Sequence, residues 1–131
     1  MTVSIQRPRV LLIDDDPSYR KLISHELRQR FFMVDAADGF EGFSRAMSSP
    51  PDLILLDMQM EGWNGLETLK RIREHGKLKY VPVIMLTSDN QRATVMEAVK
   101  NGASDYILKD KMNSDDLIVR MSNLLPFATV E

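Results

Sequence analysis

The 131-residue sequence contains no cysteine and has no excess of basic residues. The absence of cysteine excludes disulfide bonds, thiolate metal sites and cysteine nucleophiles. The 17 lysine and arginine residues are scattered along the chain and offset by 19 acidic residues, which is not the pattern of a nucleic-acid-binding surface. We therefore expect no direct binding to nucleic acid.

The sequence also lacks a long apolar run. No stretch approaches the roughly 20 residues of a membrane-spanning helix, and the first ten residues, MTVSIQRPRV, contain no signal-peptide core. We therefore expect a cytoplasmic protein that does not associate with membranes. The length favours a single domain over residues 1–131, with its core at about 9–125 and short tails. The last five residues, FATVE, fit either a free end or the start of a linker.

Short apolar runs alternate with segments of helical periodicity along the chain. The five runs are Val10 to Ile13, Phe31 to Val34, Leu53 to Leu56, Val83 to Leu86 and Tyr106 to Leu108. Nearly continuous apolar strands are typical of a parallel sheet covered by helices on both faces, and the alternation indicates a doubly wound α/β fold. We predict a five-stranded parallel sheet in the order 2-1-3-4-5, with the second strand at an edge.

The segments between the runs carry apolar residues at helical spacing. The predicted buried faces consist of Tyr19, Leu22, Ile23 and Leu27, then Leu66, Leu69 and Ile72, and then Val95, Met96 and Val99. Asp16 followed by Pro17 is a typical helix start. The other predicted boundaries are stops at Gly76 and at Asn101 with Gly102, a start at Asn113 or Ser114, and an end before Pro126.

Polar residues follow four of the five apolar runs. They are Asp14 and Asp15 after the first run, Asp57 after the third, Thr87 after the fourth and Lys109 after the fifth. In open α/β sheets, ligands bind outside the carboxyl ends of the strands, near the point where the strand order reverses. We therefore expect three carboxylates, a hydroxyl and an ammonium group to share one pocket.

The charge of this pocket predicts a metal ion. Asp14, Asp15, Asp57 and Lys109 together carry about −2, which a hard divalent cation with oxygen ligands would neutralise. Mg2+ (or Mn2+) fits best, because it binds through one or two carboxylates and keeps waters that a phosphate can replace. An aspartate beside such an ion, with a lysine and a hydroxyl nearby, is suited to phosphoryl transfer onto its own carboxylate.

Four segments resemble the receiver domain of two-component response regulators, the CheY-like module that takes a phosphoryl group from a histidine kinase. They are LLIDDDPSYRKLI, DLILLDMQMEGWNGLETLKRIR, VPVIMLTS and GASDYILK. The resemblance extends from about Arg9 to Leu125. It implies that Asp57 is the phosphoacceptor, that Asp14 and Asp15 are an acidic pair that binds the metal, and that the backbone carbonyl of Gln59 is a further metal ligand.

The resemblance also implies a switch and its partners. Thr87 and Lys109 would contact the phosphoryl group, and Tyr106 would reorient as Thr87 moves. The implied partners are a histidine kinase or histidine phosphotransfer protein, and an output domain or a second copy bound through the fourth helix, fifth strand and fifth helix. Such a domain is not an enzyme in the usual sense, because it catalyses only its own phosphorylation and dephosphorylation. Gln59 and Asp89 occupy positions that in this family tune the rate of phosphoryl loss.

Several positions depart from the family pattern. Asp110 stands where the family has a proline with a cis bond after the lysine, and we expect a trans bond here, since a cis bond before a non-proline residue costs about 3 to 4 kcal/mol. Glu61 and Asn64 replace the usual proline and aspartate, which should alter only a loop. Ser88 replaces a smaller residue, and its hydroxyl would lie at the phosphoryl site.

Other functions fit these residues less well. The segment SHELR resembles a histidine-kinase box but lacks its proline, so we expect His25 to be a surface residue. We expect His75 to lie at the end of a helix, where its charge would interact favourably with the helix dipole. A flavin site would need a phosphate loop where DDDPS stands, and an aspartate-based phosphohydrolase would need an acidic residue in place of Gln59. The main alternative is a receiver-like interaction module that works without phosphorylation.

Overall fold

Five parallel strands form a single sheet in the order β2-β1-β3-β4-β5, which confirms the predicted topology. The computed structural model describes residues 7–125, so the predicted tail at 127–131 lies outside the described residues. The strands are β1 (Arg9–Ile13), β2 (Phe32–Ala36), β3 (Leu53–Leu56), β4 (Val83–Thr87) and β5 (Asp105–Leu108). The second strand thus ends two residues later than its apolar run.

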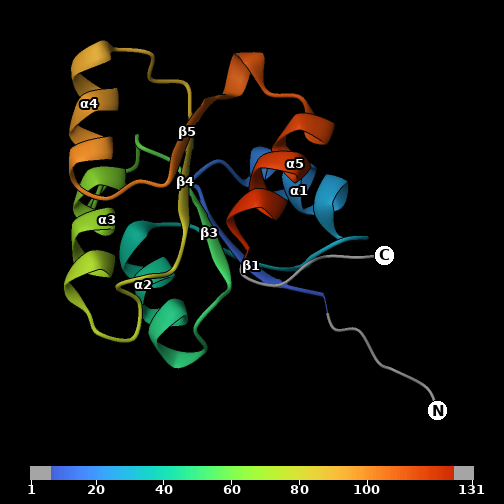
Figure 1. Cartoon of the computed structure of the whole chain (residues 1–131), viewed down its shortest axis with the longest axis horizontal. Helices are drawn as coiled ribbons and strands as arrows, with labels where there is room; N and C mark the ends of the chain where they lie inside the picture. Colours follow the sequence, from blue (N-terminus) through green and yellow to red (C-terminus); the bar gives the residue numbers. More distant parts are fainter. Residues whose placement is uncertain (1–6, 126–131) are drawn as a thin grey trace.

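Helices cover both faces of the sheet (Figure 1). They are α1 (Pro17–Leu27), α2 (Gly39–Ser48), α3 (Gly65–Glu74), α4 (Arg92–Lys100) and α5 (Ser114–Leu124), with a short 3-10 helix, η1, at Lys109–Lys111. Residues of α1 and α5 pack in one core, and residues of α2, α3 and α4 pack in the other. None of the helices within residues 7–125 is long and apolar enough to cross a membrane.

Alternate residues of each central strand enter the two cores. In β1, Leu11 and Ile13 face α2 and α3, whereas Val10 and Leu12 face α1 and α5. All four residues of β3 and all five of β4 are buried. Because a strand covered on both faces has no solvent side, its sequence is apolar throughout instead of alternating. The edge strand β2 is more exposed.

Most helix boundaries follow from local capping. The Asp16 side chain accepts hydrogen bonds from the backbone N–H groups of Ser18 and Tyr19, at 3.0 and 3.3 Å. The Asn113 side chain caps α5, which settles the start left open between Asn113 and Ser114. Gly102 ends α4 with a φ of 100°, a conformation that glycine adopts without steric cost.

The end of α3 differs from the expectation. This helix ends at Glu74 with His75 as its cap, and Gly76 does not have a positive φ. His75 turns the chain instead, since its Nδ1 accepts a hydrogen bond from the N–H of Lys77 at 3.3 Å. The prediction that Gly76 ends the helix is therefore wrong, although the helix ends only two residues before Gly76.

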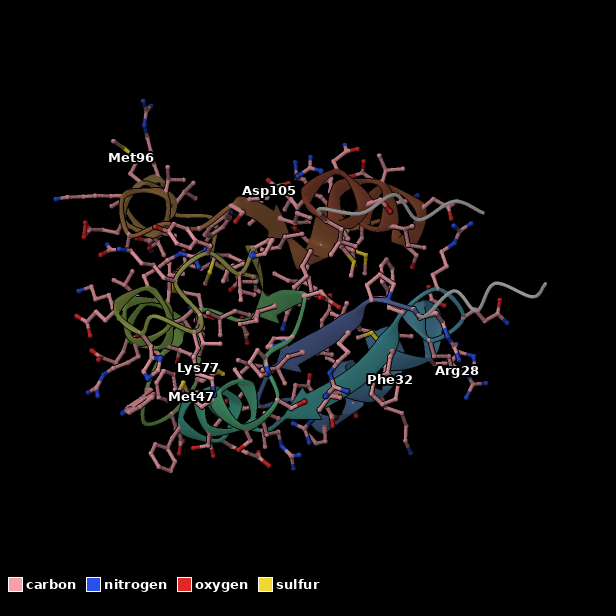
Figure 2. All side chains as sticks on the ribbon, turned by 60° about the horizontal axis from the view of Figure 1, so that its bottom comes forward. Arg28, Phe32, Met47, Lys77, Met96 and Asp105 are labelled. Atoms are coloured by element: carbon pink, nitrogen blue, oxygen red, sulfur yellow. The ribbon has the colours of Figure 1, made fainter. Side chains whose placement is uncertain are left out.

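Two predicted buried faces are partly wrong. In α1, Ile23 and Leu27 are buried but Leu22 is exposed. In α4, Ala98 is buried while Met96 and Val99 are 61% and 58% exposed, and Figure 2 shows Met96 projecting from the helix away from the sheet. The inward stripe of α4 runs through Ala98, one residue and therefore about 100° away from the predicted stripe.

Candidate functional site

Three carboxylates meet at the carboxyl ends of β1 and β3. The Asp57 N–H donates to the carbonyl of Ile13 at 3.0 Å, so the hydrogen bonding between the strands continues past β3 and fixes the backbone there. One oxygen each of Asp14, Asp15 and Asp57 lies within 4.8 Å of the other two. Asp14 and Asp57 are only 1% and 6% exposed, whereas Asp15 faces solvent. The predicted acidic cluster is therefore present.

Lys109 reaches this cluster from the first residue of η1. Its Nζ donates to Asp14 Oδ2 at 2.7 Å and lies 3.5 Å from Asp57 Oδ2. Residues 7–125 contain no cis peptide bond, so the bond between Lys109 and Asp110 is trans, as expected. The lysine therefore enters the pocket without the proline of the family pattern, and its closer partner is Asp14.

Thr87 is the last residue of β4 and is fully buried. Its Oγ1 accepts a hydrogen bond from the N–H of Asp89 at 3.2 Å. The same side chain stabilises the charged form of Asp57, as the backbone N–H of Gln59 also does. The predicted hydroxyl thus lies beside the acidic cluster and is tied to the loop that follows β4.

Burial and like charge together raise the pKa of the Asp57 carboxyl above its ordinary value. The main cause is desolvation, and the second is the neighbouring Asp14 carboxylate. Lys109, Thr87 and Gln59 oppose the rise without cancelling it. One ammonium group does not fully compensate the clustered carboxylates.

The donor set suits a hard divalent cation. It consists of three carboxylates, each with one oxygen within 4.8 Å of an oxygen of the other two. Mg2+ prefers oxygen ligands of this kind. The Asp14 carboxylate disfavours the charged form of Asp57, so further positive charge would be favourable there. The residues present therefore fit the predicted ion, while the part assigned to the carbonyl of Gln59 stays a prediction.

Tyr106 lies outside the acidic cluster but is linked to it. Its hydroxyl donates to the backbone carbonyl of Asp89 at 2.7 Å. Burial, followed by the nearby Asp89 and Asp57 charges, raises the pKa of Tyr106 to about 12. Thr87, Asp89 and Tyr106 thus form a hydrogen-bonded chain from the site toward β5.

Two site residues were not found from the sequence. The ring of Tyr19, on the first turn of α1, has its centroid 4.2 Å from Lys109 Nζ, and Arg20 Nη1 donates to the carbonyl of Asp14 at 2.7 Å. Tyr19 was predicted only as part of a buried helix face. Its contact with Lys109 joins distant parts of the chain, so no local pattern reveals it.

A groove lies beside the loop that follows Asp57. This groove of about 560 Å³, between the loop after β3 and helix α4, is lined by residues that include Gln59 and Asp89. Gln59 and Asp89 therefore border one groove. Ser88 is exposed, and His25 is exposed on α1, as expected of a surface histidine.

Several known proteins are similar to this chain in sequence. The family model described as the response regulator receiver domain matches residues 10–122. The nitrate/nitrite response regulator protein NarL of Escherichia coli is 38% identical over 120 residues, which cover 88% of this chain and 54% of that protein. The two-component response regulator ORR5 of rice is 34% identical, with 82% of each chain covered.

Solved structures agree with the sequence comparison. The chemotaxis protein CheY4 of Vibrio cholerae superposes with a TM-score of 0.85 at 29% identity, covering 91% of this chain and 99% of that one. Other curated relatives are much longer, since the matched segment is 49% of the regulator RpaA of Synechocystis and 8% of a hybrid histidine kinase of Dictyostelium. The chain therefore belongs to the receiver domain family of two-component response regulators.

Proposed function

We propose that this chain accepts a phosphoryl group on Asp57 from a phosphorylated histidine of a kinase or a phosphotransfer protein, in a Mg2+-dependent reaction. The observation that carries the proposal is the placement of Asp57. It follows the central strand β3, is nearly buried, and has the ammonium of Lys109 and the carboxylates of Asp14 and Asp15 around it. We propose that residues 9–125 act as one receiver unit in the cytoplasm and that its partners are proteins.

The proposed transfer exchanges one bond to phosphorus for another. A carboxylate oxygen of Asp57 attacks the phosphorus, the bond from phosphorus to the donor imidazole nitrogen breaks, and that nitrogen keeps the electron pair. Mg2+ held by Asp14, Asp15, Asp57 and the Gln59 carbonyl would supply positive charge to the phosphoryl oxygens. Lys109 then exchanges its contact with Asp14 for the new oxygens, and Thr87 donates a hydrogen bond to them.

Phosphorylation would change the surface formed by α4, β5 and α5. When the Thr87 hydroxyl moves to a phosphoryl oxygen, it pulls on the loop that carries Asp89, to which Tyr106 is hydrogen-bonded. Met96 and Val99 are exposed apolar side chains on α4, the helix that follows this loop. We therefore propose a population shift of this surface, which binds an output domain, a target protein or a second copy.

Intact mass measurement after treatment with acetyl phosphate and Mg2+ tests the phosphoacceptor. The wild type should gain the mass of one phosphoryl group, and Asp57→Asn should gain none. Asp110→Asn changes an exposed aspartate of η1 and serves as the matched control, which should behave as the wild type. No addition to the wild type, or addition that persists in Asp57→Asn, would refute the proposal.

Thermal unfolding with and without Mg2+ tests the metal site. Because an ion that binds only the folded protein stabilises it, Mg2+ should raise the Tm of the wild type, by an amount equivalent to about 3 kcal/mol at a hundredfold excess over Kd. Asp15→Asn should lose most of this response. An equal rise in the two proteins would show that Asp15 is not a ligand.

One observation favours the alternative of a module that works without phosphorylation. Lys109 lacks the following proline and lies closer to Asp14 than to Asp57. In that case the wild type would take up no phosphoryl group, and Asp57→Asn would bind the same partners with unchanged affinity.

A further inference from the structure

Three groups surround the ammonium of Lys109, and one of them is an aromatic ring. Asp14 and Asp57 lie 2.7 and 3.5 Å from Nζ, and the centroid of the Tyr19 ring lies 4.2 Å from it. The Lys109 side chain is 16% exposed. A cation over a ring face is attracted by the ring quadrupole, and more strongly where water is excluded.

The backbone places the Tyr19 ring at this point. Tyr19 lies in the first turn of α1, where its N–H donates to the Asp16 cap at 3.3 Å. The Asp16 cap directly follows the acidic pair, so the carboxylates, the cap and the ring belong to one short segment of the chain. The ammonium of Lys109, by contrast, is at the end of a flexible side chain, whose four carbons allow it many positions.

Tyr19 offers Lys109 a neutral surface. Its hydroxyl is buried and has no hydrogen-bond partner among the described residues. Burial, with the Asp14 and Asp57 charges as further causes, raises the pKa of Tyr19 to about 12, so the side chain is uncharged at pH 7. The ring therefore attracts the ammonium without competing as an anion, and it still allows the lysine to shift from Asp14 to a phosphoryl group.

We propose that Tyr19 is a positioning residue that holds the Lys109 ammonium at Asp57 for phosphoryl transfer. This inference rests on the proposed phosphorylation of Asp57. The ring belongs to α1 and the lysine begins η1, so the constraint on Lys109 comes from another element. The part that matters is the ring face, not the hydroxyl.

The rate of phosphorylation by acetyl phosphate with Mg2+ tests the role of the ring. Tyr19→Leu and Tyr19→Met remove the ring and keep apolar bulk, so the rate should fall about fivefold to tenfold. Tyr19→Phe keeps the ring and should stay within about twofold of the wild type. Tyr80→Leu is the matched control, since Tyr80 also lies near a lysine, Lys79, but on the open surface.

Two further measurements separate positioning from a general effect on folding. In a Lys109→Ala background, Tyr19→Leu should cause no additional loss of rate if the ring acts through the lysine. In NMR spectra, the Lys109 Hε protons should be shifted upfield by the ring in the wild type and in Tyr19→Phe, but not in Tyr19→Leu or Tyr19→Met. Thermal unfolding identifies any variant that is not folded.

The outcomes distinguish this inference from the proposed function. If the wild type takes up no phosphoryl group, the proposed function fails and the positioning role fails with it. If the wild type is phosphorylated but the two ring-less variants react at its rate, only the role of Tyr19 is overturned. The same conclusion follows if Tyr19→Leu slows the reaction equally in the Lys109→Ala background.

Discussion

At the scale of the residue, Asp57 shows how a buried carboxylate costs stability. Its side chain is nearly buried next to Asp14, and these surroundings raise its pKa. A raised pKa means that the folded protein binds this proton more tightly than the unfolded chain does. Stability is therefore lost as pH rises from the ordinary carboxyl value of 3.8 through the folded value.

Replacing this carboxylate should stabilise the protein at neutral pH. In the absence of divalent cations, we expect Asp57→Asn to raise the free energy of unfolding by about 1 to 2 kcal/mol at pH 7, because the buried repulsion with Asp14 is removed. The gain should shrink as the pH falls toward the ordinary carboxyl value of 3.8, because the raised pKa means that Asp57 of the folded wild type binds its proton above that value. Urea unfolding at both pH values measures it. A less stable Asp57→Asn protein at pH 7 would contradict the electrostatic account.

The two tyrosines near the site should titrate late. Tyr19 and Tyr106 have pKa values of about 12, mainly because of burial. Since the folded pKa is raised above the ordinary value of 10.0, their contribution to stability is complete below pH 10 and is lost between pH 10 and about 12. Absorbance of tyrosinate should show this, with Tyr19→Phe and Tyr106→Phe each removing one late step. Full ionisation of all three tyrosines near pH 10 in the folded protein would contradict it.

At the scale of the element, α4 is held less firmly than its neighbours. Ala98 is its buried residue, and Gln91 at its N-cap makes no side-chain hydrogen bond to the helix. In α1 and α5, by comparison, the caps Asp16 and Asn113 each accept two backbone N–H groups. A helix with a narrow buried stripe and no cap is well suited to move when the loop before it moves.

Adding a cap should stabilise α4 locally. Gln91→Asp provides an acceptor for the free N–H groups and a negative charge at the helix N-terminus, so the free energy of unfolding should rise by about 0.5 to 1 kcal/mol. Gln91→Ala is the matched control and should be close to neutral, because the wild-type side chain makes no cap bond. Urea unfolding at pH 7 compares the three proteins. Equal stability of the Asp and Ala variants would show that the helix start is not limiting.

At the scale of the whole molecule, the parallel sheet places the site within a chain of hydrogen bonds that leads to β5. The carboxyl ends of β1, β3 and β4 bring the acidic cluster and Thr87 together. From Thr87, hydrogen bonds through Asp89 lead to Tyr106 on β5, beside α4. This hydrogen-bonded link therefore depends on the strand order, not on a continuous stretch of sequence.

NMR chemical shifts should show coupling along this link. On phosphorylation of the wild type, changes should extend from Asp57 through Thr87 to Tyr106 and α4, because the loop after β4 connects them. Tyr106→Phe removes the hydrogen bond to Asp89 and should reduce the changes in α4 while leaving those around Asp57. Changes that stay near Asp57 in the wild type would contradict a population shift of the surface.

The sequence by itself determined the features that depend on near neighbours. The apolar runs identified all five strands, Asp16 and Asn113 identified helix starts, and the residues after the runs identified the acidic cluster with Lys109. A cap involves groups two or three residues apart, and in a parallel sheet every strand ends at the same edge. Such features can be predicted because the interactions lie within one element or follow from its direction.

The tertiary structure decided the features that depend on distant partners. It selected the stripe of α4 through Ala98, because the rotation of this helix about its axis is set by packing on the sheet and on α3, not by the periodicity of the helix itself. It also placed Lys109 closer to Asp14 than to Asp57 and set the Tyr19 ring beside it. These contacts join segments far apart in the chain, and their geometry exists only once both are packed on the same sheet.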